Sequence, residues 1–126
     1  MSLADYDGIV RTVNLYVGGF NDRDAGKFRE AFHKDAWIFY FEEDGKLNKW
    51  LLDDKVFEGW ANEKNDYIQP RVISVNQRGD VANVLLGFGD EWVDFLNLAR
   101  IDGAWKITNK TATHSSRVSP PWAKPK

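Results

Sequence analysis

The chain has 126 residues, a net charge of −2 at pH 7 and no cysteine. Its length suits one domain with a core of its own, the missing cysteines exclude disulfides and thiolate metal sites, and the lack of a basic surplus argues against nucleic acid as a partner. The N-terminal residues resemble no signal peptide and no apolar stretch could span a bilayer, so we expect a cytoplasmic protein with no membrane partner.

The first third of the chain is predicted to be helical. Ser2 or Asp5 can cap the start of a first helix, and Asp24 can cap a short second helix that carries Phe28 on its inner side. Glycines at 18 and 19 are typical of close packing or of a frayed helix end. The apolar stripe of the first helix consists of Ile9, Val13, Tyr16, Val17 and Phe20.

Beyond Asp35 the pattern changes to strands. Residues 37–41 form an aromatic strand, and Asp53 or Asp54 can cap a third short helix. Further strands are predicted at 71–76, 81–88, 92–101 and 105–113, with turns between them. Helices followed by a run of antiparallel strands indicate the α+β class. We expect one domain over residues 1–114 and an irregular tail over 115–126, which holds three of the four prolines.

The Asp102-Gly103 turn predicts how the last two strands pair. A two-residue loop sets Ile101 opposite Ala104, and opposed residues share a face; a three-residue loop would shift this register. One face then carries Phe95, Asn97, Thr108, Lys110, Ala112 and His114. The other carries Asp94, Leu96, Leu98, Ile107, Asn109 and Thr111. Both faces are largely apolar, so we expect something to cover each of them.

Six Trp and eight Phe are more aromatic bulk than so short a core ordinarily needs. We therefore expect some of these rings to line a cavity. The predicted partner is a small apolar or aromatic molecule.

Three segments resemble the nuclear transport factor 2-like superfamily, in particular its SnoaL-like and lumazine-binding branch. They are Tyr16–Asn21 on the first helix, Ala31–Ala36 before the first strand, and the closing hairpin from Asp94 to Lys110. The resemblance covers the chain to about His114. It implies a half-open cone of helices packed on a strongly curved antiparallel sheet, the cystatin-like roll of one helix and four strands, with a pocket inside; many members are dimers.

The superfamily is similar in fold to ketosteroid isomerase, and this resemblance suggests roles for three residues. Tyr16 falls where that enzyme has its oxyanion-hole tyrosine, and Asn97 where it has a protonated aspartic acid. Tyr40 falls where it has the general-base aspartate, so the resemblance does not imply the same isomerisation here. Tyr16 and Asn97 remain as two donors toward a ligand oxygen.

The candidate site joins these donors to titratable and aromatic residues. His114 or His33 would be the base of a proton-transfer reaction, because histidine is the side chain suited to proton transfer near neutral pH. Lys110 would bind an anionic group, and Phe20, Tyr40, Phe57 and Trp60 would form the walls. Each residue also has a structural interpretation: a core tyrosine at 16, a loop histidine at 33, a rim histidine at 114 and a snorkelling lysine at 110.

Three functions stay open from the sequence. The first is a small-molecule-binding domain with no cofactor and, since only two histidines exist, no metal. The second is an isomerase, cyclase or dehydratase that acts by proton transfer on a cyclic or polyketide-like substrate. The third is a dimeric interaction module. We also expect a homodimer through the outer sheet face, on a patch formed by Leu96, Leu98, Ile107, Trp92 and Trp105.

Overall fold

The computed structural model describes residues 1–118, and positions 119–126 of the predicted tail lie outside the described residues. Three α-helices and one six-stranded sheet make up the fold. Their bounds are α1 Leu3–Asn21, α2 Ala25–Ala31, β1 Phe32–Phe41, β2 Leu47–Leu51, α3 Asp54–Asn62, β3 Pro70–Arg78, β4 Val81–Phe88, β5 Trp92–Ile101, β6 Ala104–His114 and the 3-10 turn Ser115–Arg117.

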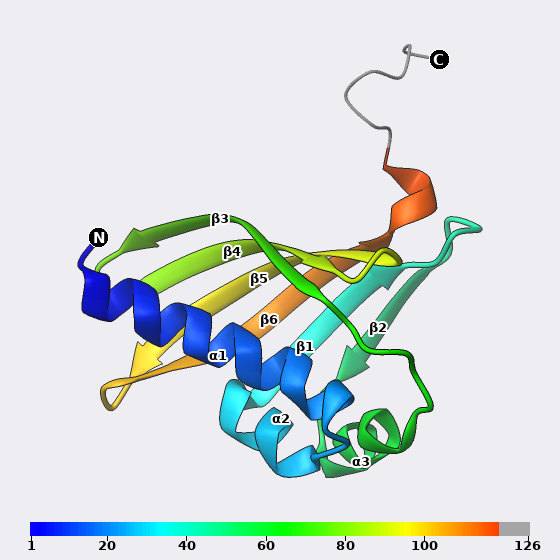
Figure 1. Ribbon diagram of the computed structural model, residues 1–126, viewed down its shortest axis with the longest axis horizontal. Coiled ribbons are helices and arrows are strands. Elements are labelled where there is room, and N and C mark those ends of the chain that lie inside the picture. Colours follow the sequence, from blue (N-terminus) through cyan, green and yellow to red (C-terminus); the bar gives the residue numbers. More distant parts are fainter. Residues whose placement is uncertain (119–126) are drawn as a thin grey trace.

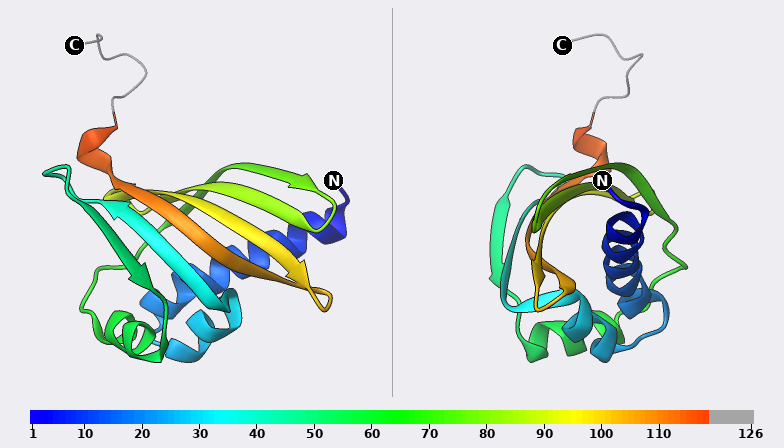
Figure 2. Two further views of the ribbon diagram at one scale, coloured as in Figure 1. Left: turned by 180° about the vertical axis from the view of Figure 1, so that it is seen from behind. Right: turned by 90° about the vertical axis from the view of Figure 1, so that its left-hand side faces the viewer.

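The sheet arches over the long helix α1, as the end-on view in Figure 2 shows. The helices α2 and α3 lie below the same concave face, near the C-terminal end of α1 (Figure 1). The predicted α+β cone with helices on a curved sheet is therefore confirmed. No helix within residues 1–118 is long and apolar enough to cross a membrane.

The three helices begin where the sequence predicts. The side chains of Ser2, Asp24 and Asp53 accept backbone N–H groups in the first turns of α1, α2 and α3, which satisfies donors that a helix start leaves free. Gly19 marks close packing: a Cβ there would lie only 2.5 Å from the ring of Phe28. Any larger residue would push α2 away from α1.

The sheet is mixed, which corrects the expectation of a wholly antiparallel one. Its strand order is β2-β1-β6-β5-β4-β3, and β1 runs parallel to β6. The edge strand β2 was not predicted, because its sequence Leu-Asn-Lys-Trp-Leu lacks β-branched residues and is mostly exposed. β1 also begins at Phe32, earlier than the predicted residue 37.

The predicted pairing of β5 with β6 holds only near the turn. Ile101 lies opposite Ala104 and Leu98 opposite Ile107, as a two-residue loop requires. A β-bulge follows, so that Asn97 pairs with Asn109 and Thr108 is the extra residue. Because one added residue reverses the faces of everything beyond it, Asn97 shares a face with Asn109 instead of Lys110.

The bulge overturns part of the predicted face assignment. Asp94, Leu96 and Leu98 point into the core with Lys110 and Ala112, whereas Phe95 and Asn97 lie on the convex outer face. Trp105 and Ile107 are buried as well. The apolar patch that we assigned to the outer face from these leucines, Ile107, Trp105 and Trp92 is therefore wrong. The leucines, Ile107 and Trp105 form the inner core, and Trp92 packs against Tyr40 on the inner side.

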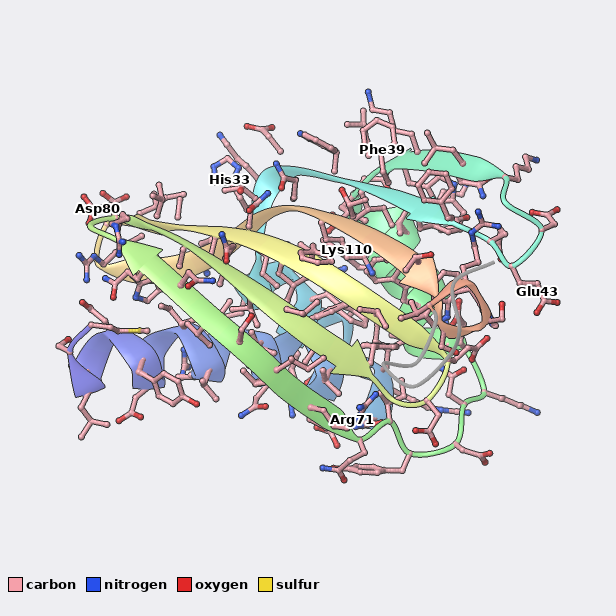
Figure 3. All side chains as sticks on the ribbon, turned by 90° about the horizontal axis from the view of Figure 1, so that it is seen from above. His33, Phe39, Glu43, Arg71, Asp80 and Lys110 are labelled. Atoms are coloured by element: carbon pink, nitrogen blue, oxygen red, sulfur yellow. The ribbon has the colours of Figure 1, made fainter. Side chains whose placement is uncertain are left out.

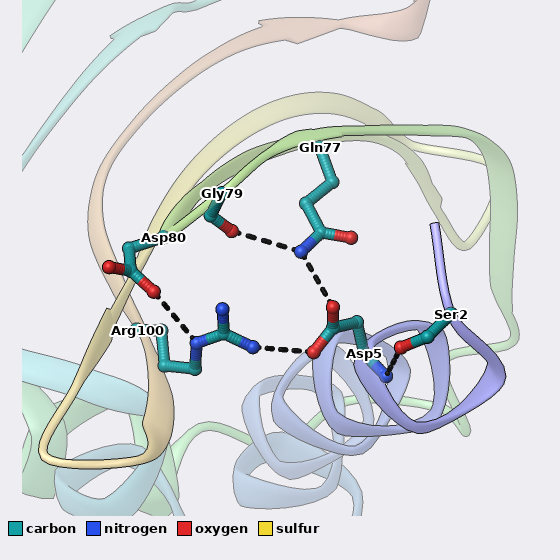
Figure 4. A network of polar contacts seen from close by, with 6 residues as sticks. All are labelled: Ser2, Asp5, Gln77, Gly79, Asp80 and Arg100. Atoms are coloured by element: carbon teal, nitrogen blue, oxygen red, sulfur yellow. Dashed lines mark hydrogen bonds and ion pairs between the residues drawn. The ribbon is translucent and has the colours of Figure 1, made fainter.

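A polar network fixes the narrow end of the cone, where α1 begins. Arg100 donates to Asp5 at 2.5 Å and to Asp80 at 2.9 Å. Gln77 donates to the other oxygen of Asp5 at 2.9 Å and to the carbonyl of Gly79 (Figure 4). These bonds tie the first turn of α1 to β3, the β3–β4 turn and β5.

Candidate functional site

A cavity of about 800 Å³ opens at the end of the cone opposite this network. It lies between α1, α3, the inner face of the sheet, the segment 63–68 and the β4–β5 turn. The side chains that line it are Tyr16, Phe20, Ile38, Tyr40, Glu42, Trp50, Trp60, Glu63, Asn65, Asp66, Tyr67, Ile68, Phe88, Asp90, Glu91, Trp92, Asp94, Lys110, Ala112, His114 and Ser115, together with Gly89.

Three polar side chains meet at the floor of the cavity. Tyr16 comes from the middle of α1, Asp94 from β5 and Lys110 from β6, and all three are buried. The Lys110 ammonium donates to the Tyr16 hydroxyl at 2.5 Å. The Tyr16 hydroxyl donates in turn to Oδ2 of Asp94 at 2.8 Å, and Lys110 Nζ lies 3.4 Å from the same oxygen.

The surroundings keep Tyr16 in its neutral form. Burial raises the pKa of Tyr16 well above its ordinary value of 10.0, and the negative charge of Asp94 raises it further. A phenol that stays protonated is a permanent donor to Asp94. Tyr16 therefore connects the ammonium of Lys110 to the carboxylate of Asp94 through two successive hydrogen bonds.

Asp94 keeps one oxygen free. Its Oδ1 is buried and has no hydrogen-bond partner among residues 1–118, although Asp94 lines the cavity. Buried acceptors normally find a partner, because an unsatisfied one loses hydration with no replacement. The floor of the cavity therefore presents an acceptor with unused capacity.

Aromatic rings surround the ammonium of Lys110. Its Nζ lies 4.9 Å from the ring centroid of Tyr16, 5.4 Å from that of Trp60 and 6.0 Å from that of Phe88. Contacts of this kind stabilise a cation whose hydration has been removed. The floor of the cavity thus holds the ion pair of Lys110 and Asp94, whose charges balance, and aromatic rings surround it.

The cavity gathers six of the nine candidate site residues: Tyr16, Phe20, Tyr40, Trp60, Lys110 and His114. Phe57 is buried behind it and stacks on Phe28 and Phe32. Asn97 lies on the outer face, where it donates to Asn109 at 2.7 Å. Asn97 therefore does not lie beside Tyr16, and the donor pair that the ketosteroid isomerase resemblance suggested is wrong.

The two histidines lie in different places. His33 sits at the beginning of β1 (Figure 3) and accepts the backbone N–H of Asp35 at 3.1 Å, outside the cavity. Its structural interpretation as a residue that orders the local backbone fits these contacts. His114 lines the cavity at the end of β6, and its ring packs edge-on against Trp92 at 5.3 Å.

Sequence reasoning missed Asp94 as a site residue, since the predicted register placed it on the opposite face from Lys110. It also missed Trp50, on the unpredicted strand β2, and the carboxylates of segments that it left as loops. Among residues 1–118, no three His, Asp or Glu side chains are grouped to hold a metal ion.

One family of known proteins matches most of the chain. The model of the family described as "Putative lumazine-binding" matches residues 4–112 of the chain. The chain belongs to this family. A nuclear transport factor 2-like protein that is 29% identical supports the superfamily that the resemblance implied.

Solved structures share the fold. A nuclear transport factor 2-like protein of unknown function from Methylobacillus flagellatus KT is 29% identical, covers 90% of this chain and 94% of its own, and has a TM-score of 0.76. A nuclear transport factor 2-like protein of unknown function from Shewanella baltica OS155 is 22% identical. The alignment covers 90% of this chain and 96% of that protein, and the TM-score is also 0.76. The protein named "Putative Scytalone Dehydratase" from Novosphingobium aromaticivorans DSM 12444 is 15% identical. The alignment covers 89% of this chain and 85% of that protein, with a TM-score of 0.68. No curated protein matches the sequence.

Proposed function

We propose that this domain binds a small molecule with an aromatic or apolar body inside the cavity. The observation that carries the proposal is Asp94, which lines a cavity of about 800 Å³ and whose Oδ1 has no hydrogen-bond partner among residues 1–118. Pockets for small ligands combine apolar walls with a few converging polar groups, and Trp60, Phe20 and Phe88 supply such walls here. An N–H or O–H group of the ligand would complete the hydrogen bonding of Asp94.

The open cavity supports this function over the purely structural alternative. An interaction module would have no need of empty space, and its own Trp and Phe side chains would fill the interior. The family description adds a concrete probe, because lumazine is a planar ring system with N–H donors and carbonyl acceptors. Its N–H would reach Asp94, and its ring would stack between the aromatic walls.

A cavity-filling variant tests the proposal. Ala112 lines the cavity, whereas its neighbour Thr111 lies on the outer face. The melting temperatures of the wild type, Ala112→Phe and Thr111→Phe are measured with lumazine and with a panel of neutral, anionic and cationic aromatic compounds. We expect at least one compound to raise the melting temperature of the wild type and of Thr111→Phe, but not of Ala112→Phe, because ligands stabilise the state that they bind. A panel without effect, or equal effects in all three proteins, would contradict the proposal.

Proton transfer is the second candidate function, and Asp94 favours it. A buried carboxylate that lines the cavity and has one oxygen without a partner among residues 1–118 can accept a proton, and the Lys110 and Tyr16 contacts would stabilise the charges that change. The fold neighbour named as a dehydratase supports this class of reaction. The test is deuterium uptake from D₂O at the carbon next to the carbonyl of 2-tetralone, followed by NMR. Uptake should depend on the protein and disappear in Asp94→Asn.

We propose further that two copies associate through the convex face of the sheet. Trp37, Phe39 and Phe41 alternate along β1 on this face; Phe39 is labelled in Figure 3. The apolar patch continues with Leu47, Leu51, Leu85, Val93 and Phe95. Leu51 is 67% exposed and Phe95 58% exposed. A patch of this extent on a soluble protein favours a second copy of the same surface.

Light scattering tests the association. We expect about twice the 14.5 kDa chain mass at micromolar concentration for the wild type. Phe95→Asp should yield the mass of one chain. Leu3→Asp, at an exposed position on α1, is the control that should stay a dimer. A monomeric wild type would contradict this arrangement.

A further inference from the structure

The mouth of the cavity is lined by carboxylates, and within the described part of the chain the same lining includes one lysine, Lys110, and no arginine. Five carboxylates line it: Glu42, Glu63, Asp66, Asp90 and Glu91. Among residues 1–118, none of them forms an ion pair with a lysine or arginine. The whole chain has a net charge of only −2, so acidic charge is concentrated at this opening.

His114 contacts Ser116 and stands near two carboxylates. Its Nδ1 accepts the backbone N–H of Ser116 at 3.2 Å. Nε2 lies 3.9 Å from Glu91, and Nδ1 lies 4.0 Å from Glu43, which projects from the β1–β2 turn (Figure 3).

Lys110, the one lysine in the lining, does not neutralise the mouth. Its ammonium is matched by Asp94 on the floor, through the direct contact and through Tyr16. The lining therefore holds more carboxylates than lysines and arginines, although Arg71 donates to the carbonyl of Gly89, beside Asp90, at 3.1 Å.

Three aromatic rings belong to the same cavity lining as these carboxylates. The ring of Tyr40 packs edge-on against Trp50 at 5.6 Å and against Trp92 at 5.9 Å, and all three line the cavity. Trp50 is still 43% exposed. Burial raises the pKa of Tyr40, and the charge of Glu42 raises it further, as expected for a ring within the field of the acidic mouth.

Faces of Trp and Tyr attract cations, and nearby carboxylates strengthen the attraction. At the opposite end, the free Oδ1 of Asp94 calls for a hydrogen-bond donor. Resting on the proposed function, we infer that the ligand is an amine-bearing aromatic molecule: its cationic group lies among Tyr40, Trp50, Trp92 and the carboxylates of the mouth, and an N–H or O–H at its other end bonds to Asp94.

Four small probes of similar shape test both ends of this ligand by calorimetry at pH 7. Tyramine has a cationic amine and a phenolic O–H. 4-Propylphenol is its neutral isostere, 3-(4-hydroxyphenyl)propanoate replaces the cation by an anion, and 2-phenylethylamine lacks the O–H. We expect tyramine to bind at least tenfold more tightly than each of the other three. Raising the NaCl concentration from 20 to 500 mM should weaken tyramine several-fold and leave 4-propylphenol unchanged, because salt screens the carboxylates.

Variants that remove carboxylates test whether the preference for tyramine arises at the mouth of the cavity. Glu42→Gln with Glu91→Gln should reduce the preference for tyramine over 4-propylphenol at least threefold. The control, Asp7→Asn with Asp102→Asn, removes two charges from α1 and from the β5–β6 turn, outside the cavity lining, and should leave the preference unchanged. Equal effects of the two pairs would overturn the inference.

The probes also separate this inference from the proposed function. If 4-propylphenol or the propanoate binds as tightly as tyramine, and Ala112→Phe abolishes that binding, the cavity binds small molecules but does not select cations. If none of the four probes binds, or if Ala112→Phe binds tyramine like the wild type, the inference fails as well. In that case the broader compound panel decides the proposed function on its own.

Discussion

Two polar networks lie at opposite ends of the cone, and they differ in how completely an aspartate is satisfied. At the narrow end, Arg100 donates to one oxygen of Asp5 and Gln77 to the other. At the cavity floor, Tyr16 and Lys110 both contact the same oxygen of Asp94, and the second oxygen has no partner among the described residues. Asp5 lies at a partly solvated edge, whereas Asp94 is almost fully buried.

The difference separates a network that holds the fold from one that is available to a ligand. Water can replace contacts of Asp5 at little cost, so its complete set of partners serves mainly to fix α1. Water has little access to Asp94, and a missing partner there is expensive. We therefore expect the two networks to respond very differently to substitution.

The largest effect should come from breaking the buried ion pair. Asp94→Asn leaves the ammonium of Lys110 without a counter-charge in the interior and should lower the free energy of unfolding by about 3–5 kcal/mol. Replacing both partners, with Asp94→Leu and Lys110→Met, should recover most of this loss because no buried charge remains. Urea denaturation measures both variants. An unchanged midpoint for Asp94→Asn would show that the pair is not held as described.

A smaller effect should follow from removing the hydroxyl between the two charges. Tyr16→Phe deletes the bond to Asp94 and the bond from Lys110 but keeps the ring in the core. Bonds to charged groups contribute about 1.5–3 kcal/mol, so we expect a loss in that range with the fold retained. Tyr6→Phe, on the exposed side of the same helix, is the matched control and should be neutral in the same denaturation experiment.

The smallest effect should come from the exposed network, and it should depend on pH. A hydrogen bond from Gln77 and the charge of Arg100 lower the pKa of Asp5 below its ordinary value of 3.8. A lowered pKa in the folded state stabilises the protein above 3.8, and the contribution is lost as the pH falls through the folded-state value. Asp5→Asn should thus melt slightly below the wild type at pH 6, and the gap should close on acidification toward pH 2.5. Asp7→Asn is the control. If its melting temperature differs from that of the wild type with the same pH dependence, the assignment to Asp5 is contradicted.

The sequence predicted the fold far better than the site. Caps, apolar stripes and turn residues are local signals, and they located all three helices and five of the six strands. The site depends on which face of β5 points inward, and that depends on a single bulge. Thr108 is an ordinary strand residue with no glycine beside it, so nothing in the pattern marks it as the extra residue. The prediction assigned Lys110 and His114 correctly to the inner face. It placed Asn97 on that face and Asp94 on the outer one, whereas the structure has them the other way round.

The parallel pairing of β1 with β6 has a consequence for the order of folding. The strands β3 to β6 follow one another in the chain and can pair through short turns, but Ile38 must find Lys110 across almost the whole domain. The entropy lost in closing a loop grows with its length, and such distant pairings form slowly. We expect the meander from β3 to β6 to form first, and β1 and β2 to join it last. The wall of the cavity that carries Tyr40 and Trp50 would then be the last to assemble and, in hydrogen exchange of the native protein, the first to open.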